Sequence, residues 1–314
     1  MLRALLSPLG WLYGAVTRAK LSRAGADVGV PVVCVGNASM GGAGKTPIVI
    51  YLLESFGRMG LEVAALTRGH GGAEAGPVAV RPEHSARDVG DEALLLGVAG
   101  PTWVSRDRVL GAAKALEAGA DILVMDDGYQ NPAIRKNLNI LVVDAEVGFG
   151  NGHVFPAGPL RERPEEALAR ADAVVLMVPD ADFDPSPALV ESFGGLPVIP
   201  AWLSARERVP GGPLVAFAGI GRPEKFFATV ERSGGTVVAT TAFPDHHVFR
   251  EDELAGLAQE ARAAGATLIT TDKDYVRLPA GFRKGVARLP VGVEFGDELL
   301  LRQVLHPVIA RAKR

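Results

Sequence analysis

Three things are scarce in this chain of 314 residues: cysteine, net charge and long apolar runs. Cys34 is the single cysteine, so an intrachain disulfide and a metal cluster built on several cysteines are both excluded, and a reducing compartment is indicated. A net charge of -3 argues against a protein that coats nucleic acid, because such proteins carry a strongly basic face. The composition therefore favours a cytosolic globular protein without a nucleic-acid partner.

The chain also lacks a run of about 18 uncharged apolar residues, the length that a transmembrane helix needs. Residues 2–16 are nevertheless mostly apolar, contain Trp11 and Tyr13, and are followed by a basic cluster at 18–23. A signal peptide would carry its charges before the apolar run, so this order does not fit one. Two interpretations stay open: a helix that lies in a membrane interface, and a helix that packs on the protein's own core.

Apolar residues make up 48% of the chain, enough for sizeable cores in two domains. Short apolar runs alternate with segments of helical spacing, which predicts an α/β fold with a mostly parallel sheet flanked by helices. The expected strands are 32–35, 63–66, 122–125, 140–143 and 174–178. A Pro/Gly-rich segment at 210–213 then precedes a smaller α/β pattern. We expect an N-terminal helix (1–24), a larger domain (25–205) and a smaller C-terminal α/β domain (206–314).

A glycine-rich loop joins the first expected strand to an apolar helix. Its residues are Ser39, Met40, Gly41, Gly42, Ala43, Gly44, Lys45 and Thr46. In a P-loop, glycines let backbone N–H groups converge on phosphate oxygens, the lysine reaches the β and γ phosphates, and the following hydroxyl binds Mg²⁺. Ser39 stands where the usual motif has its first glycine. A turn without a ligand is the alternative, but the strand–loop–helix context favours a P-loop NTPase-type domain.

Acidic residues follow at three places. Asp126 ends an apolar strand and is the candidate for the carboxylate that holds the metal beside a P-loop; an acidic turn is the alternative. Asp91 and Glu92 begin an expected helix, where carboxylates favourably face the helix dipole, and taken alone this structural interpretation is favoured. The Asp-His-His triplet at 245–247 could bind a metal, although an isolated triplet of this kind is more typical of a surface loop.

Further motifs lie in a fixed order along the chain. They are 36–37 leading into 41–47, then 67–72, 90–92, 126–130, 148–152, 156–162, 217–221, 243–246 and 270–274. With these motifs the chain resembles, from its N-terminus to about residue 278, the tetraacyldisaccharide 4'-kinases, the lipid A 4'-kinases of Gram-negative bacteria. A serine or threonine at the position of Ser39 is usual in that family. Two positions depart from its pattern, since Asn131 replaces a histidine and Asp272 a glutamate.

The resemblance implies ATP-dependent phosphorylation of the 4'-hydroxyl of a tetraacylated glucosamine disaccharide 1-phosphate, with Mg²⁺, at the cytoplasmic face of the bacterial inner membrane. It also implies that residues 2–16 form a membrane-associated helix, because a lipid with four acyl chains does not dissolve in the cytosol as a free monomer. The expected partners are this lipid substrate and the inner-membrane surface, and the enzyme is expected to be a monomer.

The resemblance also assigns roles to residues. Asp91 would orient or deprotonate the sugar hydroxyl with His246 as its partner, and Lys45 would complete the catalytic set. The expected Mg²⁺ ligands are Thr46, Glu92 and Asp126. The expected substrate or phosphate contacts are Arg68, Gln130, Asn151 and Arg161. For the two arginines, which would bind phosphate through charge-assisted hydrogen bonds, a structural salt bridge is the alternative.

Two other functions stay open at this point. A regulatory P-loop ATPase or GTPase would hydrolyse its nucleotide in response to a protein partner, and would need neither the apolar N-terminus nor the acids of the acceptor site. A kinase of a soluble small molecule would likewise not need the apolar N-terminus. Residues 271–274 resemble only loosely the Asn-Lys-x-Asp motif that recognises guanine, so ATP is the expected nucleotide.

Overall fold

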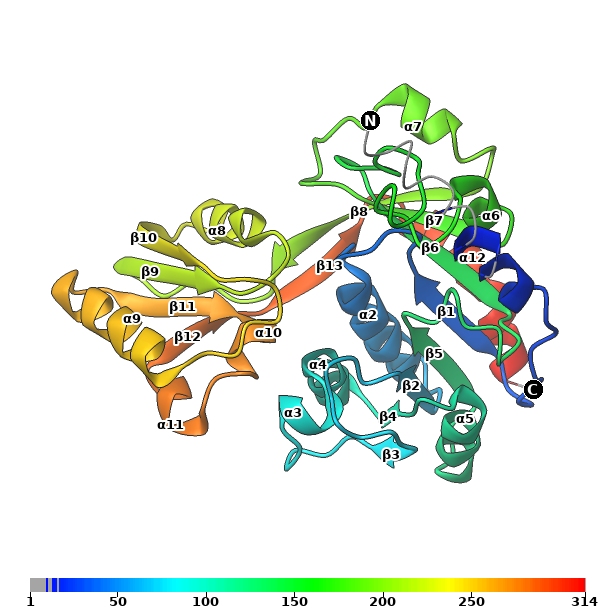
Figure 1. Cartoon of the computed structure of the whole chain (residues 1–314), viewed down its shortest axis with the longest axis horizontal. Helices are drawn as coiled ribbons and strands as arrows, with labels where there is room; N and C mark the ends of the chain where they lie inside the picture. Colours follow the sequence, from blue (N-terminus) through cyan, green and yellow to red (C-terminus); the bar gives the residue numbers. More distant parts are fainter. Residues whose placement is uncertain (1–9, 11–12, 16, 314) are drawn as a thin grey trace.

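The computed structural model describes residues 10, 13–15 and 17–313, which fold around two sheets (Figure 1). The larger sheet has nine strands in the order β13-β8-β7-β6-β1-β5-β2-β4-β3. Their bounds are β1 Val32–Gly36, β2 Val63–Thr67, β3 Val78–Ala79, β4 Thr102–Val104, β5 Ile122–Asp126, β6 Leu138–Asp144, β7 Ala173–Met177, β8 Val198–Ala205 and β13 Val291–Phe295. The edge strands β3 and β13 run antiparallel to their neighbours, and the other pairs are parallel. The expected α/β fold with a mostly parallel sheet is confirmed.

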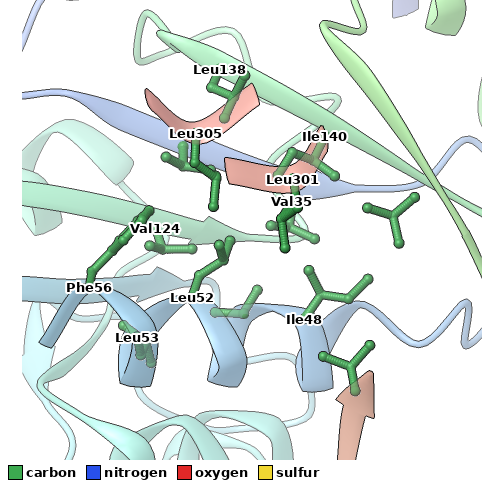
Figure 2. Packing of buried hydrophobic residues seen from close by; sticks show 14 of the residues in the cluster. Val35, Ile48, Leu52, Leu53, Phe56, Val124, Leu138, Ile140, Leu301 and Leu305 are labelled. Atoms are coloured by element: carbon green, nitrogen blue, oxygen red, sulfur yellow. The ribbon is translucent and has the colours of Figure 1, made fainter. Parts of the chain in front are cut away.

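Helices cover both faces of the larger sheet because its central strands are apolar on both sides. Every residue of β1, β5 and β7 is buried. α2 (Lys45–Arg58), α4 (Asp91–Ala99) and α12 (Glu298–Ala312) pack on one face, and α5 (Arg108–Glu117) and α6 (Pro164–Leu168) on the other. Figure 2 shows the cluster of buried side chains on the first face, in which Leu52 and Phe56 extend from α2 toward the strands and Leu305 of α12 belongs to the same core. The short helices α3 (Ala86–Val89) and α7 (Pro187–Glu191) complete this part of the chain.

The smaller sheet has four parallel strands in the order β10-β9-β11-β12. They are β9 Pro213–Ala218, β10 Thr236–Ala242, β11 Thr267–Thr271 and β12 Val286–Leu289. α8 (Pro223–Arg232) packs on one face, and α9 (Glu251–Ala263) packs on the other beside α11 (Ala280–Arg283). The one-turn helix α10 (Asp272–Tyr275) follows β11 directly. We call residues 213–289 the small lobe, and the rest of the described chain the large lobe.

The end of the chain returns to the large lobe, which differs from the expected assignment of all of 206–314 to the smaller domain. β13 pairs with β8 from Val291 opposite Ala205 to Phe295 opposite Ala201. Leu301, Leu305 and Val308 of α12 then pack against the same core as α2. The physical reason is that the edge of β8 and the apolar face of α2 both need covering, and the last apolar segments of the chain cover them.

The predicted membrane-associated helix over residues 2–16 lies mostly outside the described residues, which include only Gly10 and 13–15 of that range. Residues 13–15 and 17–21 are helical. Of the helices in the described part of the chain, none combines the length and the apolar character needed to cross a membrane.

The packing of α12 predicts a difference between two leucines of the same helix. Leu305→Ala should lower the free energy of unfolding of the large lobe by about 2–5 kcal/mol, because it leaves a cavity against α2. Leu299→Ala is the matched control, since Leu299 is 68% exposed, and it should cost less than about 0.5 kcal/mol. Chemical denaturation of both variants makes the comparison. Equal effects would contradict the placement of α12 in the core.

Candidate active site

The P-loop segment joins the carboxyl end of β1 to the first turn of α2. Val35 pairs with Asp126, so the loop and the end of β5 lie at the same edge of the sheet. Gly41 and Gly44 have φ angles of 123° and 78°, a region that favours glycine. Within the described chain no side chain caps the first turn of α2. Its N–H groups are therefore available to an anion such as a phosphate.

Lys45, the P-loop lysine, is held by a buried amide. Its Nζ donates to Asn37 Oδ1 at 3.0 Å. The Asn37 amide nitrogen donates in turn to Ser39 Oγ at 3.1 Å and to the carbonyl of Gly41 at 3.3 Å, and Asn37 has no exposed surface. The loop is thus braced from inside by a residue to which we assigned no role from the sequence. The signal that could have indicated it is its position two residues before the glycine-rich loop.

Asp127 is the second partner of the P-loop lysine. Its Oδ1 lies 3.6 Å from Lys45 Nζ and accepts a hydrogen bond of 2.8 Å from Arg161 Nη1. Burial acts to raise the pKa of Asp127, but the charges of Lys45 and Arg161 outweigh it and hold the pKa below its usual value. The backbone of Asp127 has a φ of 51°, which non-glycine residues seldom adopt and which is found most often at functional sites. Arg161 therefore lies beside the P-loop, in an ion pair with this carboxylate.

Gln130 links Arg161 to the buried interior. Its Oε1 accepts from Arg161 at 3.3 Å, and its Nε2 donates to the carbonyl of Asn37 and to Glu162 Oε1, both at 2.8 Å. Glu162 has no exposed surface and also accepts from Arg170 Nη2 at 2.5 Å. Gln130, expected as a substrate contact, is thus occupied in a network that holds the P-loop and Arg161 together.

Asp126 is the least satisfied group in the site. It is 1% exposed, and neither of its carboxylate oxygens has a hydrogen-bond partner among the described residues. Burial raises the pKa of Asp126 to about 8, and the nearby charge of Glu92 adds to the increase. An unpaired buried carboxylate is costly, and a divalent cation would supply the missing partner. Over the described residues no group of three or more histidine, cysteine, aspartate or glutamate side chains gathers closely enough to hold a metal by itself.

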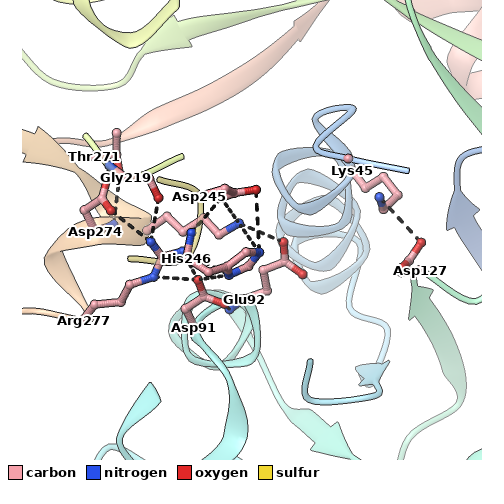
Figure 3. A network of polar contacts seen from close by, with 12 residues as sticks. Lys45, Asp91, Glu92, Asp127, Gly219, Asp245, His246, Thr271, Asp274 and Arg277 are labelled. Atoms are coloured by element: carbon pink, nitrogen blue, oxygen red, sulfur yellow. Dashed lines mark hydrogen bonds and ion pairs between the residues drawn. The ribbon is translucent and has the colours of Figure 1, made fainter. Parts of the chain in front are cut away.

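Asp91 and His246 come together across the two lobes, 155 residues apart in the chain (Figure 3). Asp91 begins α4 and is 5% exposed, and His246 lies in the loop after β10. His246 Nδ1 is 3.2 Å from Asp91 Oδ2, while Asp91 Oδ1 accepts from the Glu92 backbone N–H at 2.9 Å. The φ angle of His246 is 58°, again a rare value for a non-glycine residue. An aspartate–histidine pair thus faces the interface between the lobes, at the N-terminus of a helix.

A family model described as tetraacyldisaccharide-1-phosphate 4'-kinase matches residues 2–310, nearly the whole chain. The chain belongs to this family. The assignment decides against a regulatory P-loop switch and against a kinase of a soluble small molecule. It also confirms that the ordered motifs of the sequence belong to one enzyme rather than to a collection of common turns.

Individual relatives agree with the family model over full length. A tetraacyldisaccharide 4'-kinase of Hyphomonas neptunium is 47% identical over 312 residues, which cover 99% of this chain and 92% of the relative. One of Rhodospirillum centenum is 48% identical over 320 residues, covering 99% and 93%. Among solved structures, the "apo" form of LpxK from Aquifex aeolicus in complex with ATP is 27% identical, with a TM-score of 0.77, and covers 98% of this chain and 100% of that one.

Two cations of the small lobe, to which we gave no role from the sequence, also reach the Asp91 region of this 4'-kinase family member. Arg277 Nε donates to Asp91 Oδ2 at 2.8 Å, and Lys273 Nζ lies 3.4 Å from both Glu92 Oε1 and His246 Nε2. Burial acts to raise the pKa of Asp91, but the hydrogen bond from His246 and the charges of Arg277 and Lys273 hold it well below its usual range. The signal that could have indicated them is their position shortly after β11, with Lys273 on α10 and Arg277 in the turn that follows it.

The remaining expected site residues are not brought into these contacts. Asn151 builds its own loop, donating to the carbonyl of Ala157 at 3.1 Å and accepting from the His153 N–H at 3.1 Å. Arg68 is an exposed residue directly after β2. The nearby His70 ring lies edge-on to His246, with 5.7 Å between the ring centroids. The structure thus places Asn151 in a supporting loop, and Arg68 on the open surface of the carboxyl edge of the sheet.

The buried network behind Arg161 predicts a stability effect. Glu162→Gln should lower the free energy of unfolding by about 1–3 kcal/mol, because Arg170 loses its ionised acceptor inside the protein. Glu165→Gln, three residues further along in α6, is the control, since Glu165 is exposed, and it should change stability by less than about 0.5 kcal/mol. Urea denaturation of both variants measures the difference. If the two variants unfold alike, Glu162 does not carry the network.

Proposed function

We propose that this tetraacyldisaccharide 4'-kinase of lipid A biosynthesis binds ATP at the P-loop of the large lobe and completes its acceptor site with the small lobe. The observation that carries the proposal is the contact of Asp91 with His246 across the lobe interface. The ATP complex of the Aquifex aeolicus relative supports the choice of nucleotide. The reaction moves the γ-phosphate of ATP to the 4'-hydroxyl of the disaccharide.

The P-loop positions the phosphates. The backbone N–H groups of residues 41–46 bind phosphate oxygens, whereas the Met40 N–H already donates to the carbonyl of Pro159. Lys45 moves from Asn37 and Asp127 to the β and γ phosphates. Arg161 lies on the same side, where its charge stabilises the transferring group. Until the nucleotide binds, Asp127 holds the side chains of Lys45 and Arg161 beside the P-loop.

The residues around Asp126 fit a magnesium ion, because its two buried carboxylate oxygens have no hydrogen-bond partner in the part of the chain that the structure describes. Thr46, Asp126 and Glu92 would hold the ion. When bound, Mg²⁺ neutralises charge on the β and γ phosphates. Lys273, now beside Glu92, keeps that carboxylate oriented in the absence of the ion.

The acceptor hydroxyl binds at Asp91. This carboxylate orients the hydroxyl for in-line attack, and the Asp91–His246 pair takes up its proton as the new P–O bond forms. Because phosphoryl transfer depends mainly on positioning and on charge neutralisation, Lys45 and Arg161 contribute as much as the proton acceptor. His246 is exposed on one side, with 38% of its side chain accessible, so the proton can leave to solvent.

The enzyme works as a monomer at the cytoplasmic face of the inner membrane, with residues 2–16 lying in the membrane interface. The described end of this segment supports the proposal. Tyr13 packs edge-on against Phe155 at 6.2 Å, and both rings are at least 40% exposed. The loop of Phe155 continues to Leu160, which pairs with Ser39 of the P-loop. Tyr13, in the described part of the segment, therefore lies close to the loop that we propose binds the nucleotide, which supports a membrane contact on the side where the lipid headgroup would arrive.

The kinase reaction is tested with purified protein, Mg-ATP and tetraacyldisaccharide 1-phosphate in detergent micelles. We expect the bisphosphate as product. Asp91→Asn should lower kcat by about 10²-fold to 10⁴-fold with little change in the KM for ATP, whereas Lys45→Ala should impair both. Asp252→Asn, a change of an exposed acid of the small lobe, is the control and should leave kcat unchanged. ATP hydrolysis without any bisphosphate in the wild type would refute the proposal.

The membrane proposal is tested by deleting residues 1–16. The shortened protein should no longer sediment with vesicles of anionic lipid. Changing Arg18, Lys20 and Arg23 together to glutamine should weaken binding by about 1 kcal/mol for each residue and make it insensitive to salt. Undiminished sedimentation of the shortened protein would locate the membrane contact elsewhere.

A further inference from the structure

Arg277 extends from the small lobe to the carboxylate at the start of α4 (Figure 3). Its side chain is 7% exposed. Nε donates to Asp91 Oδ2 at 2.8 Å, and Nη2 donates to the same oxygen. The pair joins residues 186 positions apart in the chain and spans the lobe interface.

The guanidinium is oriented by the small lobe itself. Nη1 donates to the carbonyl of Gly219 at 2.8 Å and to Asp274 Oδ1 at 3.0 Å. Asp274 has no exposed surface, and its Oδ2 accepts from the Gly219 N–H at 3.0 Å and from Thr271 Oγ1 at 2.7 Å. Residues at the ends of β9 and β11 therefore hold Arg277 in one orientation. The guanidinium would move with the small lobe if that lobe moved relative to the large lobe.

The two carboxylate oxygens of Asp91 accept hydrogen bonds from different parts of the protein. Oδ2 is contacted by Nε and Nη2 of Arg277 and by His246 Nδ1, all from the small lobe. Oδ1 accepts the backbone N–H of Glu92, from its own helix, and is given no further donor by the described residues. Since each carboxylate oxygen has about two acceptor positions, Oδ1 is the oxygen that can still accept a hydroxyl proton.

We propose that Arg277 is a positioning residue for phosphoryl transfer, which fixes Asp91 through Oδ2 so that Oδ1 faces the acceptor hydroxyl. The inference rests on the proposed function, in which Asp91 binds that hydroxyl. Arginine suits this role because its planar fork holds a carboxylate in one rotamer, whereas lysine supplies only a point charge. Productive geometry at Asp91 then requires the small lobe in place, and a misplaced carboxylate would slow the transfer without weakening the binding of nucleotide.

The experiment measures kcat and both KM values for Arg277→Gln and Arg277→Lys with Mg-ATP and tetraacyldisaccharide 1-phosphate. Arg277→Gln should lower kcat about 10²-fold and change each KM by less than about threefold. Arg277→Lys should keep the wild-type melting temperature and lose about tenfold in kcat. Arg262→Gln, which changes an exposed arginine of α9, is the matched control and should keep the wild-type kcat.

The deciding comparison is made in the Asp91→Asn background. If Arg277 acts through Asp91, then Arg277→Gln added to Asp91→Asn should leave the residual kcat within about threefold, so the two effects are not additive. A further drop of tenfold or more would overturn the proposal, as would wild-type kcat in Arg277→Gln or in Arg277→Lys. If Arg277→Gln does not fold, Arg277→Lys in both backgrounds makes the same comparison. Failure of the wild type to form the bisphosphate would instead refute the proposed function.

Discussion

The site depends on one buried carboxylate that cannot be left unpaired. Asp91 is almost fully enclosed in the large lobe, and an isolated charge there would be costly. Its cationic and histidine partners, Arg277, Lys273 and His246, all belong to the small lobe. The two lobes are therefore held together at the point where we propose that the acceptor binds. The strained backbone of His246 fits this arrangement, because a rare φ angle persists only where the surroundings hold it.

At the P-loop, in contrast, one buried carboxylate is paired with two cations and its neighbour in the sequence is unpaired. Lys45 and Arg161 are already paired with Asp127, while Asp126 beside it has no partner among the described residues. In the proposed mechanism, the phosphates of the nucleotide would replace Asp127 as the partners of Lys45 and Arg161, and a divalent cation would be the missing partner of Asp126. The charges of the large lobe therefore fit a metal–phosphate complex better than either ion separately.

Patterns in the sequence predicted those features of the structure that are made by neighbouring residues. Runs of adjacent residues predict the strands β1, β2, β5, β6 and β7, the glycine-rich loop and the acid at the end of β5. They do not predict β3, β4, β8 and β13, which complete the same sheet. The contacts of Arg277 with Asp91 and of Lys45 with Asn37 could not be predicted that way, because they depend on how distant segments meet after folding. Gln130 and Asn151, which we expect to contact the substrate, also make hydrogen bonds that hold loops in place, and their motifs did not indicate these bonds.

The return of the chain to the larger sheet has a consequence for synthesis on the ribosome. The small lobe is continuous in sequence and can form as soon as residues 213–289 have emerged. The large lobe is built from two separate stretches of sequence. The edge of β8 has no partner until β13 has been synthesised, and the apolar face of α2 is not covered until α12 has been synthesised. The helix α2 after the P-loop therefore stays partly uncovered until α12 has emerged. The part of the protein that binds the nucleotide begins first and is finished last.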